Sequence, residues 1–110
     1  MMSMYSDYMK EKESLETYEN EYGFITYKKV KDVCYIGDFY VKPQYRGKRH
    51  TTDIANKVEE IAKGMGCNMM LAEVDTQDNN PEQGMYVQLR HGYKFSHIHN
   101  NSIIYFYKRI

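Results

Sequence analysis

The residues with the clearest chemical meaning lie in a cationic loop at positions 44–51 of this 110-residue sequence. The loop places a glycine among basic or titratable side chains, in the order Arg46, Gly47, Lys48, Arg49 and His50. A helical pattern follows, so the loop leads into a helix N-terminus, where unpaired backbone N–H groups attract phosphate. The glycine lets the backbone approach a ligand, and the cations add charge-assisted donors. The loop therefore predicts an anion-binding site; a solvated basic loop is the alternative.

Histidine and cysteine side chains raise the question of a metal site. His91, His97 and His99 lie near the end of the chain, but no cysteine or carboxylate stands beside them in sequence. This spacing favours surface or turn histidines over metal ligands. Cys34 and Cys67 are isolated from each other within apolar segments, which is typical of buried, reduced thiols. We therefore predict no metal.

The composition indicates one globular domain spanning residues 1–110. Hydrophobic residues make up 42% of the chain, enough for a core despite a mean hydropathy of -0.77. Fifteen basic and fifteen acidic residues give a net charge of zero with neutral histidines. Because bulk nucleic-acid binders are strongly basic, this balance disfavours nucleic acid as a partner.

No apolar run in the sequence approaches the roughly 20 residues that a membrane helix requires. Met69–Ala72 is among the longest such runs. Residues 1–12 also lack the basic start, apolar stretch and small-residue cleavage site of a signal peptide. We expect a cytoplasmic protein with no membrane partner.

The first half of the sequence predicts a short helix followed by three antiparallel strands. Apolar residues within residues 2–12 recur at helical spacing. Leu15–Tyr18 and Gly23–Lys28 alternate on either side of a turn, which is typical of a hairpin. Val33–Val41 is a longer strand, and the glycine in its middle indicates a bulge or a close backbone approach.

The second half predicts a helix between two parallel strands. Six residues form an apolar stripe at helical spacing: Ile54, Ala55, Val58, Ile61, Ala62 and Met65. Thr51 or Thr52 is expected to cap this helix and Gly64 or Gly66 to end it. Asn68–Val74 then reads as a strand, so a parallel crossover is predicted. A helix over residues 83–90 and a hairpin of residues 93–98 and 103–108 complete an α/β fold.

The stretch Phe39–Lys48 resembles the acetyl-CoA-binding segment of the GNAT N-acetyltransferase superfamily. In that family a strand ending in Val-x-Pro leads into an Arg-Gly-Lys-Gly-type loop and a helix; this chain has Val41-Lys42-Pro43 and Arg46-Gly47-Lys48. Later landmarks follow in the family's order, at Ala62–Cys67, Asn79–Pro81 and Arg90–Lys94. The resemblance covers residues 15–108, and a chain rich in Tyr, Asn, Lys and Met fits an AT-rich genome such as that of a phage.

The resemblance implies a GNAT-like mixed sheet, with antiparallel N-terminal strands and a parallel strand–helix–strand crossover at the cofactor site. It implies acetyl-CoA as the cofactor. Backbone groups of Phe39, Tyr40 and Val41 would pair with the pantetheine arm. The loop from Arg46 to Thr51 would hold the diphosphate. Asn79 or Asn80 would bind the pantetheine or adenine side, and Asn80 is the residue we predict; a loop-capping role is the alternative.

The resemblance also implies which residues would promote the attack of an amine on a thioester. A carboxylate, Asp38 or Glu73 on the two central strands, would remove the amine proton; an exposed or salt-bridged strand carboxylate is the alternative. In the family, the leaving thiolate is often protonated by a tyrosine four residues before the glycine of the last loop. In this chain that position is Gln88. Tyr86 is the nearest tyrosine, but two residues along a helix turn it by about 200°, so a core or surface role is the alternative.

Two positions of the loop depart from the family's pattern. In the register set by Pro43, Arg49 and Thr51 occupy the two places where the family has small residues. A register that starts at Gln44 instead recovers Gly47 but puts Arg49 at the last small-residue place. The Arg49 side chain would either crowd the diphosphate or pair with one of its phosphates.

The resemblance therefore implies an enzyme that transfers an acetyl group from acetyl-CoA to a primary amine of a small molecule or a protein. The alternative is a GNAT-shaped binding module with weakened catalysis that docks on a protein or nucleic acid through Arg46–His50. Homodimer formation through exposed edge strands stays open.

Overall fold

The computed structural model describes residue 4 and residues 15–77 and 81–110. The elements occur in this order: β1 (Glu16–Glu19), β2 (Gly23–Val30), β3 (Val33–Val41), the 3-10 turn η1 (Pro43–Tyr45), α2 (Arg49–Gly64), β4 (Met69–Asp75), α3 (Pro81–Arg90), β5 (Lys94–His99) and β6 (Ile103–Arg109). The helix predicted over residues 2–12 lies outside the described residues, Met4 excepted.

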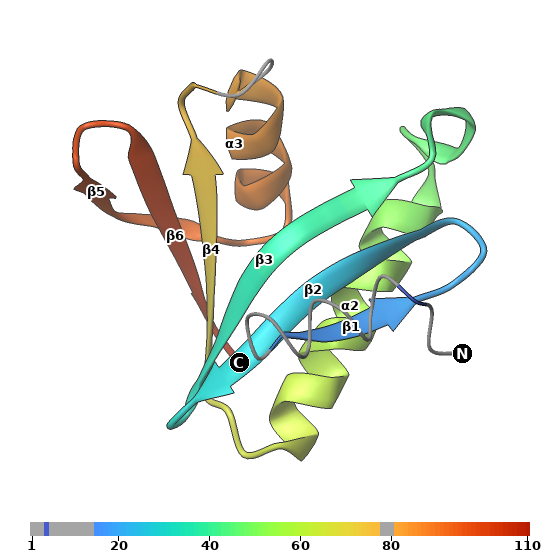
Figure 1. Ribbon diagram of the computed structural model, residues 1–110, viewed down its shortest axis with the longest axis horizontal. Coiled ribbons are helices and arrows are strands. Elements are labelled where there is room, and N and C mark those ends of the chain that lie inside the picture. The colour runs from blue at the N-terminus through green and yellow to red at the C-terminus, as the bar shows by residue number, and fades with distance from the viewer. Residues whose placement is uncertain (1–3, 5–14, 78–80) are drawn as a thin grey trace.

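The described strands form one mixed sheet in the order β1-β2-β3-β4-β6-β5. β3 and β4 are parallel, while β1–β2, β2–β3, β4–β6 and β5–β6 are antiparallel. The predicted fold class and the parallel crossover through α2 are thus confirmed. β6 lies between β4 and β5, so the last strand of the chain pairs with β4 and leaves β5 at the edge of the sheet (Figure 1).

The hydrophobic core lies between one face of the sheet and the two helices. α2 packs against β2 and β3, and α3 packs against β4. Ile25, Ile54, Val58 and Met70 are almost completely buried there. The apolar stripe predicted for α2 supplies its buried residues, which are Ile54, Val58 and Ala62. Both cysteines are buried and free, as predicted.

A β-bulge interrupts β3 at its glycine. Ile25 of β2 pairs with Phe39 and Tyr27 pairs with Ile36, so Gly37 and Asp38 together oppose Thr26. The fully buried Thr26 fills the bulge, where its Oγ1 accepts a 2.7 Å hydrogen bond from the backbone N–H of Asp38. A Cβ atom at Gly37 would lie 2.5 Å from that oxygen, which explains the glycine. The sequence-based prediction of a bulge or close approach at this glycine is confirmed.

β3 and β4 pair only at their N-terminal ends and then separate. The parallel ladder joins Val33 to Met69, Cys34 to Met70 and Tyr35 to Leu71, and it stops just before the bulge. Figure 1 shows the two strands starting side by side and diverging toward their C-terminal ends. β4 continues along β6 as far as Asp75. The C-terminal half of β3 therefore has one edge that no strand covers in the described structure.

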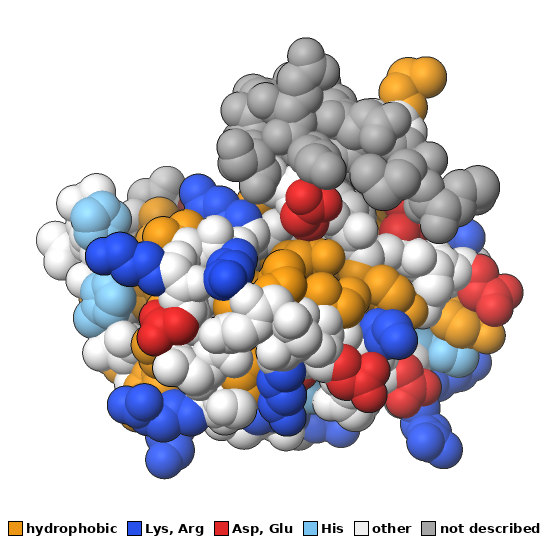
Figure 2. Space-filling model, turned by 90° about the horizontal axis from the view of Figure 1, so that it is seen from below, with side chains coloured by type: hydrophobic (Ala, Val, Ile, Leu, Met, Phe, Trp, Pro, Cys, Tyr) orange, Lys and Arg blue, Asp and Glu red, His pale blue; other side chains and the backbone are white. Residues whose placement is uncertain are grey.

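The surface carries charges of both signs. Figure 2 shows Lys and Arg side chains intermixed with Asp and Glu over the face that it displays, which agrees with the zero net charge of the sequence. In the described part of the chain, no helix is long and apolar enough to cross a membrane.

The hydroxyl of Thr26 should stabilise the bulge. We expect Thr26→Val to lower the free energy of unfolding by about 1–3 kcal/mol in urea denaturation, because the Asp38 N–H loses its acceptor while the side-chain shape is kept.

Thr17→Val is the matched control for this change. Thr17 pairs with Thr26 across β1 and β2, but its buried Oγ1 has no hydrogen-bond partner among the described residues. Its substitution should leave stability unchanged or raise it. An equal loss in both variants would contradict the role assigned to Thr26.

Candidate functional site

An open cleft of about 980 Å³ lies where β3 diverges from β4. β3, the cationic loop, the start of α2, β4 and α3 all contribute to its walls. The cleft brings together ten of the site residues predicted from the sequence: Asp38, Phe39, Tyr40, Val41, Arg46, Gly47, Lys48, Arg49, Thr51 and Glu73. Its volume is at the upper end of the range typical of small-molecule sites.

The uncovered edge of β3 presents backbone donors to this cleft. The N–H of Asp38 donates to Thr26 and that of Lys42 donates to the Tyr22 carbonyl oxygen, so both point toward β2. Backbone groups alternate in direction along a strand, which turns the N–H groups of Phe39 and Val41 toward the gap. The β3–β4 ladder ends at Tyr35 and does not reach them. The side chain of Phe39 packs toward the core instead.

Arg46 is held at the end of this edge. Its Nε donates a 2.8 Å hydrogen bond to the Val41 carbonyl oxygen, and its guanidinium lies 5.5 Å from the centre of the Tyr40 ring. The Val41 carbonyl is therefore occupied, whereas the N–H of Val41 faces the gap. The fixed Arg46 places a positive charge at the mouth of the cleft.

The cationic loop ends in a helix that begins earlier than the sequence predicts. α2 begins at Arg49, with Lys48 at the N-cap, and no side chain among the described residues caps it. The predicted caps Thr51 and Thr52 lie inside the first turn, so that prediction was wrong. Gly47 has φ +72°, a left-handed conformation that favours glycine and turns the chain into the helix. The N-terminal N–H groups of α2 thus open on the cleft wall with Lys48 and Arg49 beside them.

His50 differs from its neighbours in the loop. It is not among the residues that line the cleft in the described structure. Its ring stacks on Tyr22 with a centroid distance of 3.7 Å and an interplanar angle of 20°. Tyr45 packs edge-on against it at 5.4 Å. In the described structure His50 thus packs the loop against the β1–β2 turn through aromatic contacts, and its predicted contact with a cofactor stays a prediction.

The two candidate carboxylates, Asp38 and Glu73, are exposed and line the cleft from β3 and β4. Glu73 pairs in register with Tyr105 of β6. The pKa of the Tyr105 phenol is raised, first by burial and then by the Glu73 carboxylate and its hydrogen bond. Both carboxylates are thus placed to accept a proton from a molecule in the cleft, and Glu73 also accepts a hydrogen bond from Tyr105.

α3 supplies a wall that the sequence did not predict. Val87, Gln88, Arg90 and His91 line the cleft from the end of this helix. The spacing from Gly92 had placed Gln88 toward the site, but only the fold shows that His91 joins it. The side chain of Tyr86 and all of Asn80 lie outside the described part, so their predicted roles stay predictions.

No group of three or more His, Cys, Asp or Glu side chains is arranged to hold a metal ion in the part of the chain that the structure describes.

The comparisons with known proteins agree with this architecture. The chain belongs to the GNAT acetyltransferase family, whose sequence model matches residues 7–93. The resemblance seen at Phe39–Lys48 is thereby confirmed. No curated protein sequence matches the chain.

Solved structures share the fold at low sequence identity. PaiA N-acetyltransferase from Thermoplasma acidophilum, solved with coenzyme A, is 21% identical with a TM-score of 0.70, over 81% of this chain and 54% of that one. A Bacillus subtilis acetyltransferase in complex with CoA is 13% identical with a TM-score of 0.72, over 94% and 83%. A Bacillus cereus acetyltransferase is 21% identical with a TM-score of 0.70, over 87% and 71%. The chain thus spans about half the length of PaiA.

The left-handed conformation of Gly47 should require glycine. We expect Gly47→Ala to lower the free energy of unfolding by about 1–2 kcal/mol, because a Cβ atom strains a residue with positive φ. Thermal and urea denaturation measure this loss.

Gly64→Ala is the control at a helical glycine with equally open surroundings, since an added Cβ at either position meets no atom of the described residues within 4 Å. Gly64 is the last residue of α2, where alanine should be neutral or stabilising. The same loss at both glycines would show that φ is not the cause.

Proposed function

We propose that this protein is an acetyl-CoA-dependent N-acetyltransferase that acts in the cytoplasm on a primary amine of a small molecule or a protein. One observation carries the proposal: the N–H groups of Phe39 and Val41, which no strand pairs within the described structure, and the N-terminus of α2, which no described side chain caps, open on the same cleft. Family membership agrees with this function.

The donor groups of the cleft match the acceptor groups of coenzyme A. A pantetheine arm carries amides, which can extend along the N–H groups of Phe39 and Val41 as an added strand would. A diphosphate suits the N-terminus of α2, where helix-dipole charge and backbone donors attract anions. Lys48 and Arg49 lie at this positive end, and no acidic residue occurs in the first turn. Cations beside the positive end of a helix are unfavourable unless an anion binds there, so the presence of these two residues supports an anionic ligand.

The chain's own groups fit the chemistry of acetyl transfer. Acetyl-CoA supplies, when bound, a thioester carbonyl that an amine can attack. The Phe39 N–H faces the gap at the bulge and can donate to an oxygen that gains negative charge. Asp38 and Glu73 are the exposed carboxylates of the same cleft and can accept a proton directly or through water.

Gln88 favours a second candidate function, a cofactor-binding module with weakened catalysis that docks on a partner through Arg46–His50. It lines the cleft from α3, and its amide has no proton to give in acid catalysis. Binding of acetyl-CoA without release of the coenzyme thiol, across small and polymeric amines, would favour this module.

Calorimetric titration with coenzyme A tests the binding step, and a substitution of Arg49 tests whether this residue contributes to it. We expect wild-type protein to bind, and Arg49→Gln to weaken binding by about 3- to 10-fold because an exposed phosphate–arginine pair is lost.

Lys57→Gln is the matched control, since it removes the same charge from the same helix. Lys57 is exposed, pairs with Glu60 at 3.7 Å and does not line the cleft. The affinity of Lys57→Gln for coenzyme A should equal that of the wild type. No binding by the wild type would overturn the proposed function, and tighter binding by Arg49→Gln would show that this arginine crowds the diphosphate.

A further inference from the structure

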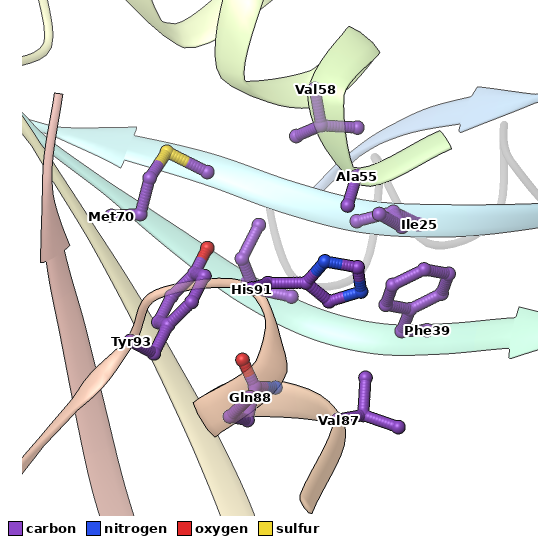
Figure 3. Close-up of a pocket in the computed structure, with 10 residues that line it drawn as sticks. Ile25, Phe39, Ala55, Val58, Met70, Val87, Gln88, His91 and Tyr93 are labelled. Atoms are coloured by element: carbon purple, nitrogen blue, oxygen red, sulfur yellow. The ribbon is translucent and has the colours of Figure 1, made fainter. Parts of the chain in front are cut away.

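His91 occupies a position between the cleft and the interior. It follows the last residue of α3, is half-buried, and lines the cleft together with Gln88 and Arg90. On its inner side it lines a small cavity of about 20 Å³ with apolar residues of β2, β3 and α2. Figure 3 shows its imidazole pointing from the end of α3 toward Phe39 of β3. The ring therefore reaches from α3 toward the strand whose backbone donors face the gap.

The charged groups around His91 come from three elements. Lys108 of β6 and Glu59 of α2 form a 2.9 Å ion pair, and Arg90 precedes the histidine on α3. Burial lowers the pKa of His91, Lys108 and Arg90 lower it further, and Glu59 opposes them. The buried phenol of Tyr93 also lines the inner cavity, and burial raises its pKa, so it stays neutral. The imidazole is consequently neutral at pH 7 and has a lone pair available to accept a proton.

The other proton acceptors of the cleft are placed less well. Asp38 and Glu73 are exposed strand carboxylates, and Glu73 already accepts a hydrogen bond from Tyr105. Among the described residues that line the cleft, His91 is the one imidazole, the side chain whose ordinary pKa lies closest to neutrality. A base of this kind can take up a proton in one step and release it in the next.

We propose that His91 is a catalytic residue that carries the proton of the acyl transfer, an inference that rests on the proposed function. The amine nitrogen forms a bond to the acetyl carbon and its proton passes to the free imidazole nitrogen of His91. The carbon–sulfur bond then breaks, and the imidazolium gives the same proton to the departing thiolate. The products are the amide and the neutral coenzyme thiol, and His91 returns to its neutral form. Gln88 beside it needs no part in the proton transfer.

Kinetics of His91→Gln test this role, with release of coenzyme thiol from acetyl-CoA measured for n-butylamine and polylysine as small-molecule and protein-type probes. We expect kcat to fall by about 100-fold, because general base catalysis is lost, while the Kd for coenzyme A changes less than about twofold. His97→Gln is the control, since His97 is exposed on β5, stacks on Tyr105 and does not line the cleft. It should keep wild-type kcat.

The pH profile separates a catalytic role from a structural one. Because the neutral form of His91 is active and its pKa is lowered, wild-type kcat should fall only as the pH drops below the ordinary histidine value of about 6.5. The acidic limb should disappear in His91→Gln. In nuclear magnetic resonance titration of the free protein, the His91 imidazole should titrate below the ordinary histidine value of about 6.5, and acetyl-CoA should shift its resonances.

Two results would overturn the inference while leaving the proposed function standing. One is wild-type kcat in His91→Gln; the other is an acidic limb that His91→Gln retains. Binding of acetyl-CoA without any thiol release by the wild type would overturn both the inference and the transferase activity. Failure of the wild type to bind coenzyme A would remove the proposed function at its first step.

Discussion

The bulge that Thr26 holds open in β3 is the constraint on which the site depends. One buried hydroxyl accepts the N–H of Asp38, the extra residue bends the strand, and the pairing of β3 with β4 stops at Tyr35, just before this bend. Had the ladder continued, the backbone donors of Phe39 and Val41 would bond to β4 and no cleft would exist. A buried side-chain hydrogen bond thus decides whether the strand edge is closed by protein or open to a ligand.

The electrostatics of the cleft follow from this opening. The diverging strands leave space beside the N-terminus of α2, which no side chain caps in the described part of the chain and which has Lys48 and Arg49 next to it. Arg46 is tied to the Val41 carbonyl, and His50 is tied to Tyr22, so the loop is fixed at both ends. The positive charge therefore stands at one end of the cleft, while His91 and the two carboxylates lie along its walls.

The sequence was most informative where the signal is local. The stripe of α2 and the glycine of β3 predicted the helix face and the bulge, since periodicity and a missing Cβ are properties of neighbouring residues. The start of α2 was wrong by a few residues because Thr51 and Thr52 resemble caps, whereas the left-handed Gly47 sets the turn. His50 was predicted to bind the cofactor and His91 to be a surface or turn histidine. The sequence could not show that His50 stacks on Tyr22 or that His91 lines the cleft, because both contacts join distant segments. The sequence pattern also could not predict that β6 lies between β4 and β5.

Amide hydrogen exchange at β3, measured with and without saturating coenzyme A, tests the central claim most directly. The N–H of Asp38 should be protected in both states, because it is bonded to Thr26. The N–H groups of Phe39 and Val41 should exchange rapidly in the free protein and slow by at least about tenfold when the ligand pairs with them. Slow exchange of these two amides in the free protein, or rates that coenzyme A leaves unchanged, would contradict an open strand edge that binds the cofactor.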